Sequence, residues 1–284
     1  MSIVIGTNKS SLQAANYLSA NQTQLSNTLS ALSSGSRLTN PSTDSGGLAV
    51  SMQLTATANR DSALINTIAN AQSFLQTQNG ALQVATSIVD RISQLVTMSK
   101  DVTLTTTNTA NYNTEFSQLQ SELTTIIGAQ YNGIALFTSG TVSGSLSVLS
   151  TNDLSTSNAI SIAQLNLGAT TSGAGNIGSL SSSSTTNGYT SLTAIGASDI
   201  TSFVNTIATF AATNGAEQSR LNFASQLATN DRTSLQSANS SISDTDIAQA
   251  TTALAKWNVL VQAGTSMLTQ ANNSAQTVLK LITG

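Results

Sequence analysis

The sequence lacks cysteine and histidine altogether, has a single proline, and draws only 4% of its residues from the aromatic types. Without cysteine the chain forms no disulfide, so its fold does not depend on oxidation state, which suits an exported protein. Without histidine and cysteine it also lacks the usual ligands of a catalytic zinc and the usual nucleophile–base pairs. We therefore predict that it is not an enzyme and has no catalytic residue, metal site or cofactor.

Charge is the second scarcity. Charged residues make up 7% of the 284 residues, against about 25% in typical soluble proteins, and the formal net charge is -3. A balance this weak offers no attraction to nucleic acid or to an anionic membrane. No stretch reaches the roughly 18 apolar residues of a membrane span, so we expect no membrane insertion. Residues 1–30 lack the unbroken apolar core of a cleavable secretory signal. A surface so poor in charge favours a protein that is either coated, for instance with sugars, or built to associate.

What the sequence does contain is helical periodicity at both ends. Near each terminus, apolar or small residues recur at alternating spacings of 3 and 4, the pattern of a coiled-coil seam, meaning the row that faces a partner helix. The C-terminal row is Ile247, Ala250, Leu254, Trp257, Val261, Gly264, Leu268, Ala271, Ala275, Val278 and Ile282. The N-terminal row is Ala15, Leu18, Gln22, Leu25, Leu29 and Leu32, and it stops before Gly35, a residue typical of a helix C-terminus. Each row needs a partner helix, and the other row is the simplest one within the chain.

Longer helical patterns lie inside these ends. Between residues 48 and 100, apolar residues recur every seven positions, at Ile68, Leu75, Leu82, Val89 and Val96. Residues 103–113 are mostly polar and predict a loop, and residues 114–127 predict a shorter helix. Helical spacing returns at Asp199, a suitable N-cap, and the register breaks at 243–246 before the last helix.

The middle of the chain has a different texture. The Asn132-Gly133 pair is a strong signal for a tight hairpin turn, and short alternating stretches follow around residues 146–148, 160–162 and 165–167. Serine and threonine are abundant there. Residues 129–198 therefore predict a small hairpin-rich β region with flexible connections. The Ser/Thr-rich stretch is most simply an uncharged solvated surface, and O-glycosylation is the functional alternative.

Taken together, the fold class is mainly α. The expected architecture has long antiparallel coiled-coil helices formed by both chain ends, with a small β-hairpin region in the middle. Trp257 is most simply a core anchor, and a specific contact between subunits is the alternative.

Several segments of this layout resemble the bacterial flagellins. They are 32–40 (LSSGSRLTN), 44–50 (DSGGLAV), 131–133 (YNG), 243–248 (SDTDIA) and 262–272 (QAGTSMLTQAN). The resemblance extends over roughly residues 1–138 and 199–284. It implies an inner terminal-helix domain (1–43 and 244–284), a long-helix bundle domain (44–138 and 199–243) and a β-hairpin, Ser/Thr-rich outer segment (139–198).

The resemblance also implies a function. The chain would be a structural subunit that polymerises into the extracellular flagellar filament for swimming, after export by the flagellar type III apparatus. The polymerisation surface would be the two terminal seams. Implied partners are further copies of itself, a flagellar export chaperone, and the hook-associated junction and cap proteins. Two alternatives stay open: the hook–filament junction protein, and a secreted coiled-coil adhesin or translocator.

One further patch carries over from the family. Arg91, Leu95 and Glu122 match flagellin positions contacted by the vertebrate Toll-like receptor for flagellin, and residues 89–95 (VDRISQL) resemble the recognised helix. The simpler interpretation is that this surface serves packing, since Leu95 belongs to an apolar face.

Overall fold

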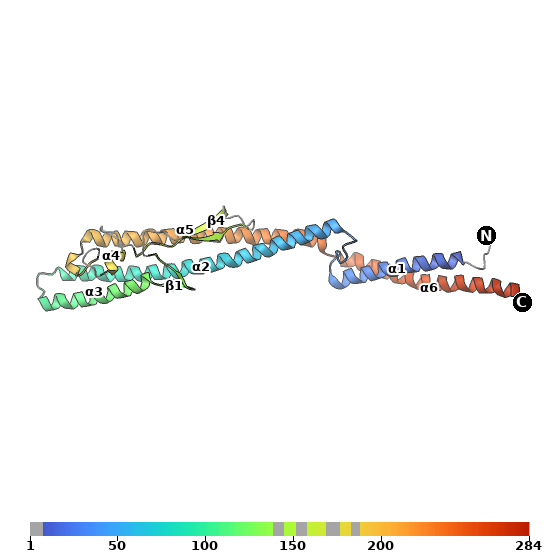
Figure 1. Ribbon diagram of the computed structural model, residues 1–284, viewed down its shortest axis with the longest axis horizontal. Coiled ribbons are helices and arrows are strands. Elements are labelled where there is room, and N and C mark those ends of the chain that lie inside the picture. The colour runs from blue at the N-terminus through green and yellow to red at the C-terminus, as the bar shows by residue number, and fades with distance from the viewer. Residues whose placement is uncertain (1–7, 139–144, 152–157, 169–176, 183–187, 284) are drawn as a thin grey trace. The chain divides into compact units, whose positions relative to one another are not determined.

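The structure is a computed structural model, and it describes residues 8–138, 145–151, 158–168, 177–182 and 188–283. The helices are α1 (Lys9–Ser34), α2 (Ser45–Ser99), α3 (Thr106–Ile127), α4 (Ile177–Ser181), the 3-10 turn η2 (Leu192–Ala194), α5 (Ala197–Ser243) and α6 (Ile247–Thr283). The strands are β1 (Gln130–Tyr131), β2 (Ile134–Ala135), β3 (Ser145–Leu149) and β4 (Ala159–Ala163). The predicted fold class is confirmed: the protein is mainly α, with helices from both chain ends packed together, and the described part of the middle segment forms two small sheets beside α2 and α5 (Figure 1).

The chain divides into two compact units. The terminal unit comprises Met1–Ala58 and Thr233–Gly284, and the middle unit comprises Asn59–Arg232. Because α2 and α5 each contribute residues to both units, the boundaries between the units fall within helices rather than in loops. No described helix is both long enough and apolar enough to cross a membrane.

In the terminal unit, α1 and α6 run antiparallel, side by side (Figure 1). At one end the Asn8 side chain donates to the Ala271 carbonyl at 2.9 Å, and at the other the Thr245 hydroxyl donates to the Ala31 carbonyl at 3.5 Å. Helix α1 ends as predicted, because Gly35 adopts the left-handed conformation with φ +72° that a residue without a Cβ takes at little cost.

In the middle unit, the predicted heptad row of α2 forms the core. Ile68, Leu75, Leu82, Val89 and Val96 are all buried. Facing them, α5 buries Phe203, Ile207, Leu221, Ala224 and Ala228, within the stretch from Asp199 onward for which helical spacing was predicted. The long helices thus pack through the faces that their periodicity defines.

Three buried polar side chains set the register of this packing. Asn214 of α5 donates to the Leu75 carbonyl at 3.0 Å and to Gln78 Oε1 at 2.7 Å. Gln78 then donates to the Leu136 carbonyl at 2.8 Å, which ties α2 to the segment after β2. Glu217 accepts from the Ala163 backbone N–H at 2.9 Å, which ties α5 to β4. Each of these hydrogen-bonding partners lies at a single level along the helices. A shift of α5 along α2 by one helical turn would therefore leave buried polar groups without hydrogen bonds.

The predicted hairpin is present. β1 and β2 pair antiparallel through Asn132 and Gly133, both with positive φ (50° and 79°), as a type I′ turn requires. β3 and β4 form a second antiparallel pair, in which Leu146 lies opposite Ile162.

Three local predictions are wrong. Residues 103–113 are not all loop, because the Thr105 side chain caps α3 by accepting from the Asn108 N–H at 3.3 Å, and the helix begins at Thr106. Leu165 and Leu167 do not form a strand, and Leu165 makes an isolated bridge with Phe137.

Asp199 is likewise not the N-cap of α5. It lies in the first turn of that helix, and its carboxylate accepts from the Gly196 N–H at 2.8 Å. In each case the cap or bridge depends on contacts that periodicity alone does not reveal.

The middle of the chain is also less purely β than predicted. It contains the helical turns α4 and η2, whose Leu180 and Leu192 are buried in the same core cluster as α2 and α5. Ile160 and Ile162 of β4 belong to this cluster too. The described part of 139–198 therefore packs within the middle unit.

Candidate self-association surface

The contact between α1 and α6 is built around a close approach at Gly264. A Cβ placed on this glycine would lie 3.2 Å from Leu18 Cδ1 and 3.8 Å from the Leu18 Cα. At the next positions along the row, Leu254, Trp257, Val261, Leu268 and Ala271 are half-buried, and Ala250 is buried. Lys256 Nζ lies 5.1 Å from the Trp257 ring centroid, and a cation at that distance is attracted to the ring face.

Two ends of the predicted C-terminal row differ from its middle. Ile247 opens α6 and remains 53% exposed. The side chains of Val278 and Ile282 lie outside the described part of α6.

On α1 the predicted row needs a correction. Leu18, Leu25 and Leu32 are half-buried, as expected for the seam. Leu29 is 56% exposed, however, and Gln22 is exposed as well, while Asn21 and Thr28 take their places on the inner face. Two rows with 3–4 spacing share the leucines at 18, 25 and 32, and which row faces α6 depends on where α6 lies rather than on hydrophobicity.

The pairing leaves the terminal unit with little core of its own. Helix α1 has no buried residue. Large apolar side chains remain exposed on both helices, among them Leu12 (64%), Tyr17 (63%), Val259 (64%) and Met267 (64%). Charge does not compensate, since α1 and α6 together carry only three lysines and no acidic residue. This surface is poor in charge, and among the described residues its exposed apolar side chains have no covering partner in the single chain.

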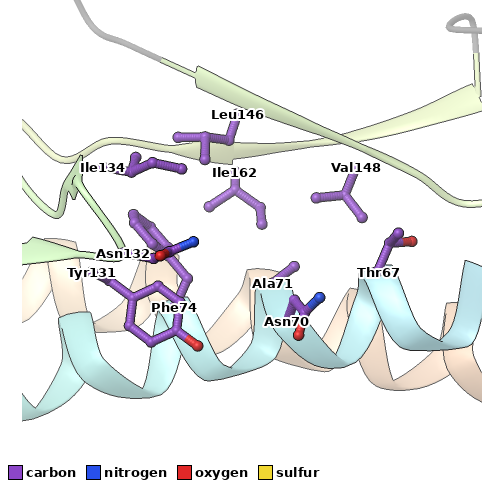
Figure 2. Close-up of a pocket in the computed structure, with 10 residues that line it drawn as sticks. All are labelled: Thr67, Asn70, Ala71, Phe74, Tyr131, Asn132, Ile134, Leu146, Val148 and Ile162. Atoms are coloured by element: carbon purple, nitrogen blue, oxygen red, sulfur yellow. The ribbon is translucent and has the colours of Figure 1, made fainter.

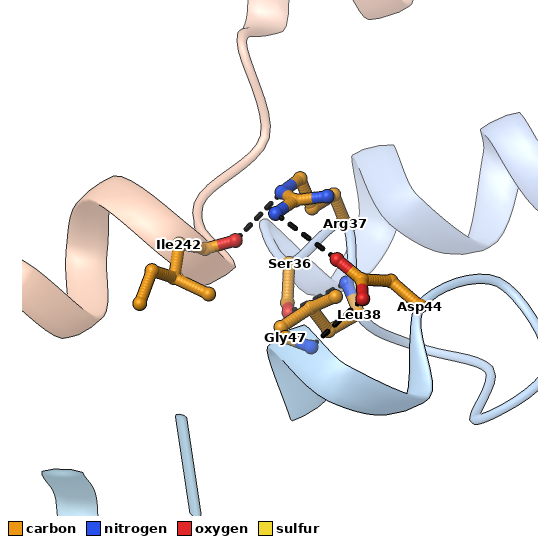
Figure 3. Close-up of polar contacts among 6 residues, drawn as sticks. All are labelled: Ser36, Arg37, Leu38, Asp44, Gly47 and Ile242. Atoms are coloured by element: carbon orange, nitrogen blue, oxygen red, sulfur yellow. Dashed lines mark hydrogen bonds and ion pairs between the residues drawn. The ribbon is translucent and has the colours of Figure 1, made fainter. Parts of the chain in front are cut away.

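The connections beside the α1–α6 pair are held by backbone pairing and by one arginine (Figure 3). The Arg37 N–H donates to the Ser243 carbonyl at 2.8 Å, and Ser36 and Asp244 form an antiparallel bridge. The Arg37 Nε donates to the Ile242 carbonyl at 2.6 Å, and its guanidinium lies 3.5 Å from the Asp44 carboxylate.

Asp44 also caps α2 in this region, accepting from the Gly47 N–H at 2.7 Å. A Cβ at Gly47 would lie 2.8 Å from Asp44 Cγ, so a larger residue there would displace the capping carboxylate. The α1–α2 turn is thereby tied to the α5–α6 turn.

A separate hollow lies in the middle unit, between α2 and the two hairpins (Figure 2). Its volume is about 310 Å³, and none of its ten lining residues is charged. The apolar part of the wall consists of Phe74, Tyr131, Ile134, Leu146, Val148 and Ile162. Phe74 and Tyr131 meet edge to face, with ring centroids 6.1 Å apart. Asn132 of the predicted turn lies at its rim, so the turn shapes the pocket (Figure 2).

At the predicted receptor-binding patch, Arg91 forms an ion pair with Glu115. Arg91 Nε lies 2.7 Å from Glu115 Oε1, and Nη1 donates to Gln94 at 3.2 Å. The hydrogen bond and the charge of Glu115 raise the pKa of Arg91. Glu122 is exposed, but Leu95 is fully buried, so the chain brings only two of the three predicted receptor contacts to the surface. Leu95 belongs to the buried apolar face of α2, as its spacing indicates.

Groups with perturbed ionisation lie apart from one another. Burial, with Asp199 nearby, raises the pKa of Tyr189 to about 12, and burial also raises the pKa of Glu217. Among the described residues, no three acidic side chains gather in a way that would hold a metal ion.

Sequence reasoning missed three functional groupings that the structure assembles. The Gln78–Asn214 pair gave a partial signal, because both residues are polar members of otherwise apolar rows. The sequence contains no signal for the role of Arg37 or for the hollow beside Ile134, because each depends on segments that are far apart in the sequence.

The chain matches two family models, the bacterial flagellin N-terminal helical region over residues 5–142 and the bacterial flagellin C-terminal helical region over residues 198–282. It is 29% identical over 284 residues to the flagellar filament 30.7 kDa core protein of Treponema maltophilum, covering 99% of this chain and 100% of that one. It is 28% identical to the flagellin of Listeria monocytogenes, with 98% and 99% of the two chains covered. It is also 28% identical to the flagellin of Halalkalibacterium halodurans, with 99% and 100% covered.

Proposed function

Because the chain belongs to the bacterial flagellin family and is a structural, non-enzymatic subunit of the extracellular flagellar filament, we propose that its α1–α6 pair is the surface through which copies associate. One observation carries the proposal: α1 has no buried residue in the single chain, although it presents large apolar side chains. Apolar surface of this kind gains free energy when a second copy covers it, at roughly 25 cal/mol per Å².

The geometry of the pair suits a tube wall. A filament of one subunit needs heterologous contacts that repeat without closing. Apolar side chains point away from the α1–α6 contact in several directions, so a pair has free surface toward more than one neighbour. With no acidic residue on either helix and only three lysines, repulsion between stacked copies is small. On this proposal the half-buried residues of the two terminal seams pack within the subunit, and the exposed ones, Leu29 and Ile247 among them, contact neighbouring subunits.

A matched pair of substitutions tests the proposal. Val259→Asp places a charge on the outer face of α6, at a side chain that is 64% exposed, and Val102→Asp makes the same change at a 98% exposed turn position. Neither should alter the circular dichroism of the monomer. We expect Val259→Asp to abolish long tubes in seeded polymerisation viewed by electron microscopy, and Val102→Asp to leave them. Normal tubes from Val259→Asp would refute the assignment of this face.

Further partners follow from family membership and remain proposals. They are the flagellar export chaperone and the hook-associated junction and cap proteins, all of which would engage the terminal helices before or at the ends of assembly. Native mass spectrometry of the monomer mixed with the chaperone from the same cell would test the first. A monomer that stays unbound at micromolar concentration would remove that partner.

Recognition by the Toll-like receptor for flagellin is a weaker proposal, which now rests on Arg91 and Glu122, since Leu95 is buried. A reporter assay in which Arg91→Ala leaves the signal unchanged would remove it. O-glycosylation of the Ser/Thr-rich stretch would appear as an intact mass above the bare 29.0 kDa.

A further inference from the structure

Helix α5 carries an apolar ridge that has no role within the chain. Phe223 is 68% exposed and Leu227 is 52% exposed. Four residues apart, they stand one above the other on the same helix face, with Cβ atoms about 5–6 Å apart. The buried row of α5 at Leu221, Ala224 and Ala228 already provides its contact with α2, so this ridge, defined as Phe223 and Leu227, faces away from the core.

The same unit contains a feature complementary to the ridge. The pocket between α2 and the hairpins has a volume of about 310 Å³ and apolar walls, and Ile134 at its edge is 41% exposed. The sticks in Figure 2 surround an open space between the α2 ribbon and the strands above it. Its polar lining residues, Thr67, Asn70 and Asn132, are uncharged, so an aromatic ring entering it would desolvate no ionised group.

Ridge and pocket lie at the same height of the helix pair. Gln72, which lies within the α2 stretch that lines the pocket, donates to Asn222 at 2.8 Å, and Asn222 directly precedes Phe223. A protrusion and a hollow at one level can join neighbouring copies that stand side by side. It is also heterologous, since two different patches of the same chain meet, and such contacts propagate instead of closing a dimer.

We propose that the pocket receives the Phe223–Leu227 ridge of a neighbouring copy of this chain, as a lateral contact between middle units. The inference rests on the proposed function, because it requires that copies assemble. It adds a second contact, separate from the α1–α6 surface, and gives it a direction: ridge of one subunit, pocket of the next.

The absence of cysteine in the chain allows a direct test. Monomers of Phe223→Cys and Ile134→Cys are mixed in equal amounts, polymerised, checked for tubes by electron microscopy, and oxidised with diamide. We expect a disulfide-linked dimer containing one copy of each variant, and none from filaments of either variant alone. A mixture of Phe223→Cys with Val84→Cys is the matched control, because Val84 is 50% exposed on α2 but does not line the pocket.

The outcomes separate the two proposals. If no tubes form from the wild-type chain, the proposed function fails. If tubes form but the mixed dimer is absent, or if Phe223→Cys filaments link to themselves, the ridge–pocket contact is wrong. As a second measurement, Phe223→Ala should raise the critical concentration for polymerisation about tenfold, because an aromatic anchor leaves an apolar pocket. Val204→Ala, at another exposed apolar position of α5, should leave it within twofold.

Discussion

Gly264 of α6 packs against Leu18 of α1 so closely that a Cβ on the glycine would lie 3.2 Å from Leu18 Cδ1. The residue that a helix interior normally disfavours is here the one that lets two backbones approach. The contrast with Gly80, in the middle of α2, is direct, because a Cβ on Gly80 would meet nothing within 4 Å.

These two glycines should respond differently to the same substitution. Gly80→Ala should stabilise the protein by about 0.5–1 kcal/mol, since alanine has the higher helix propensity and there is open space around it. Gly264→Ala should gain less or nothing, because Leu18 must shift to make room, and Gly264→Leu should separate α1 from α6. Urea unfolding of the monomers measures the change in stability for Gly80→Ala and for Gly264→Ala. Equal gains at both positions would contradict the close approach.

The terminal helices should be the least stable part of the monomer. Helix α1 has no buried residue, whereas α2 buries a full heptad row, so local opening of α1 and α6 should be much less costly. Hydrogen exchange should therefore be fast in α1 and α6 of the monomer and slow in the filament, with residues 68–96 of α2 protected in both. Monomer protection of α1 equal to that of α2 would show that assembly does not stabilise the ends.

The buried Asn214 should be important for the stability of the middle unit. Its side chain donates to Leu75 and Gln78, and truncation leaves those acceptors buried without their donor. Asn214→Ala should lower the free energy of unfolding by about 1–3 kcal/mol. Asn230→Ala, on an exposed position of the same helix, should change it by less than about 0.5 kcal/mol. Thermal unfolding of both variants makes the comparison, and losses of similar size would contradict the role of the buried hydrogen bonds, because alanine has the higher helix propensity at both positions.

Glu217 should make stability depend on pH. Burial raises its pKa above the ordinary 4.5, an effect that outweighs the opposing hydrogen bond from Ala163 and the charge of Arg220. The folded state therefore binds this proton more tightly than the unfolded chain does, and the stability it contributes is complete below the ordinary pKa and lost as the pH rises through the folded value.

Glu217→Gln removes the titration and keeps an oxygen for the Ala163 N–H. Relative to this variant, the wild-type free energy of unfolding should fall as the pH rises from below the ordinary pKa of 4.5 through the raised pKa of the folded state. Urea unfolding across that range measures the difference. A difference that stays constant with pH would mean that Glu217 ionises normally in the folded protein.

Periodicity predicted much of the fold because it records which face of a helix is buried. The heptad row from Ile68 to Val96, the end of α1 at Gly35 and the Asn132-Gly133 turn all follow from local chemistry, namely side-chain spacing, positive φ and the hairpin preference for Asn-Gly. The start of α3 was missed because its first turns are polar and only the Thr105 cap marks it.

The candidate assembly surface was predictable in part. The sequence alone determined that both ends are helices with matching rows and almost no charge, because spacing and composition are properties of the chain itself. The tertiary structure decided which of two overlapping rows on α1 faces α6, that Leu29 and Ile247 stay exposed, and that Leu95 is buried. It also placed the Phe223–Leu227 ridge level with the pocket. These outcomes depend on where a second element lies, and a hydrophobic pattern specifies that a face needs covering without specifying what covers it.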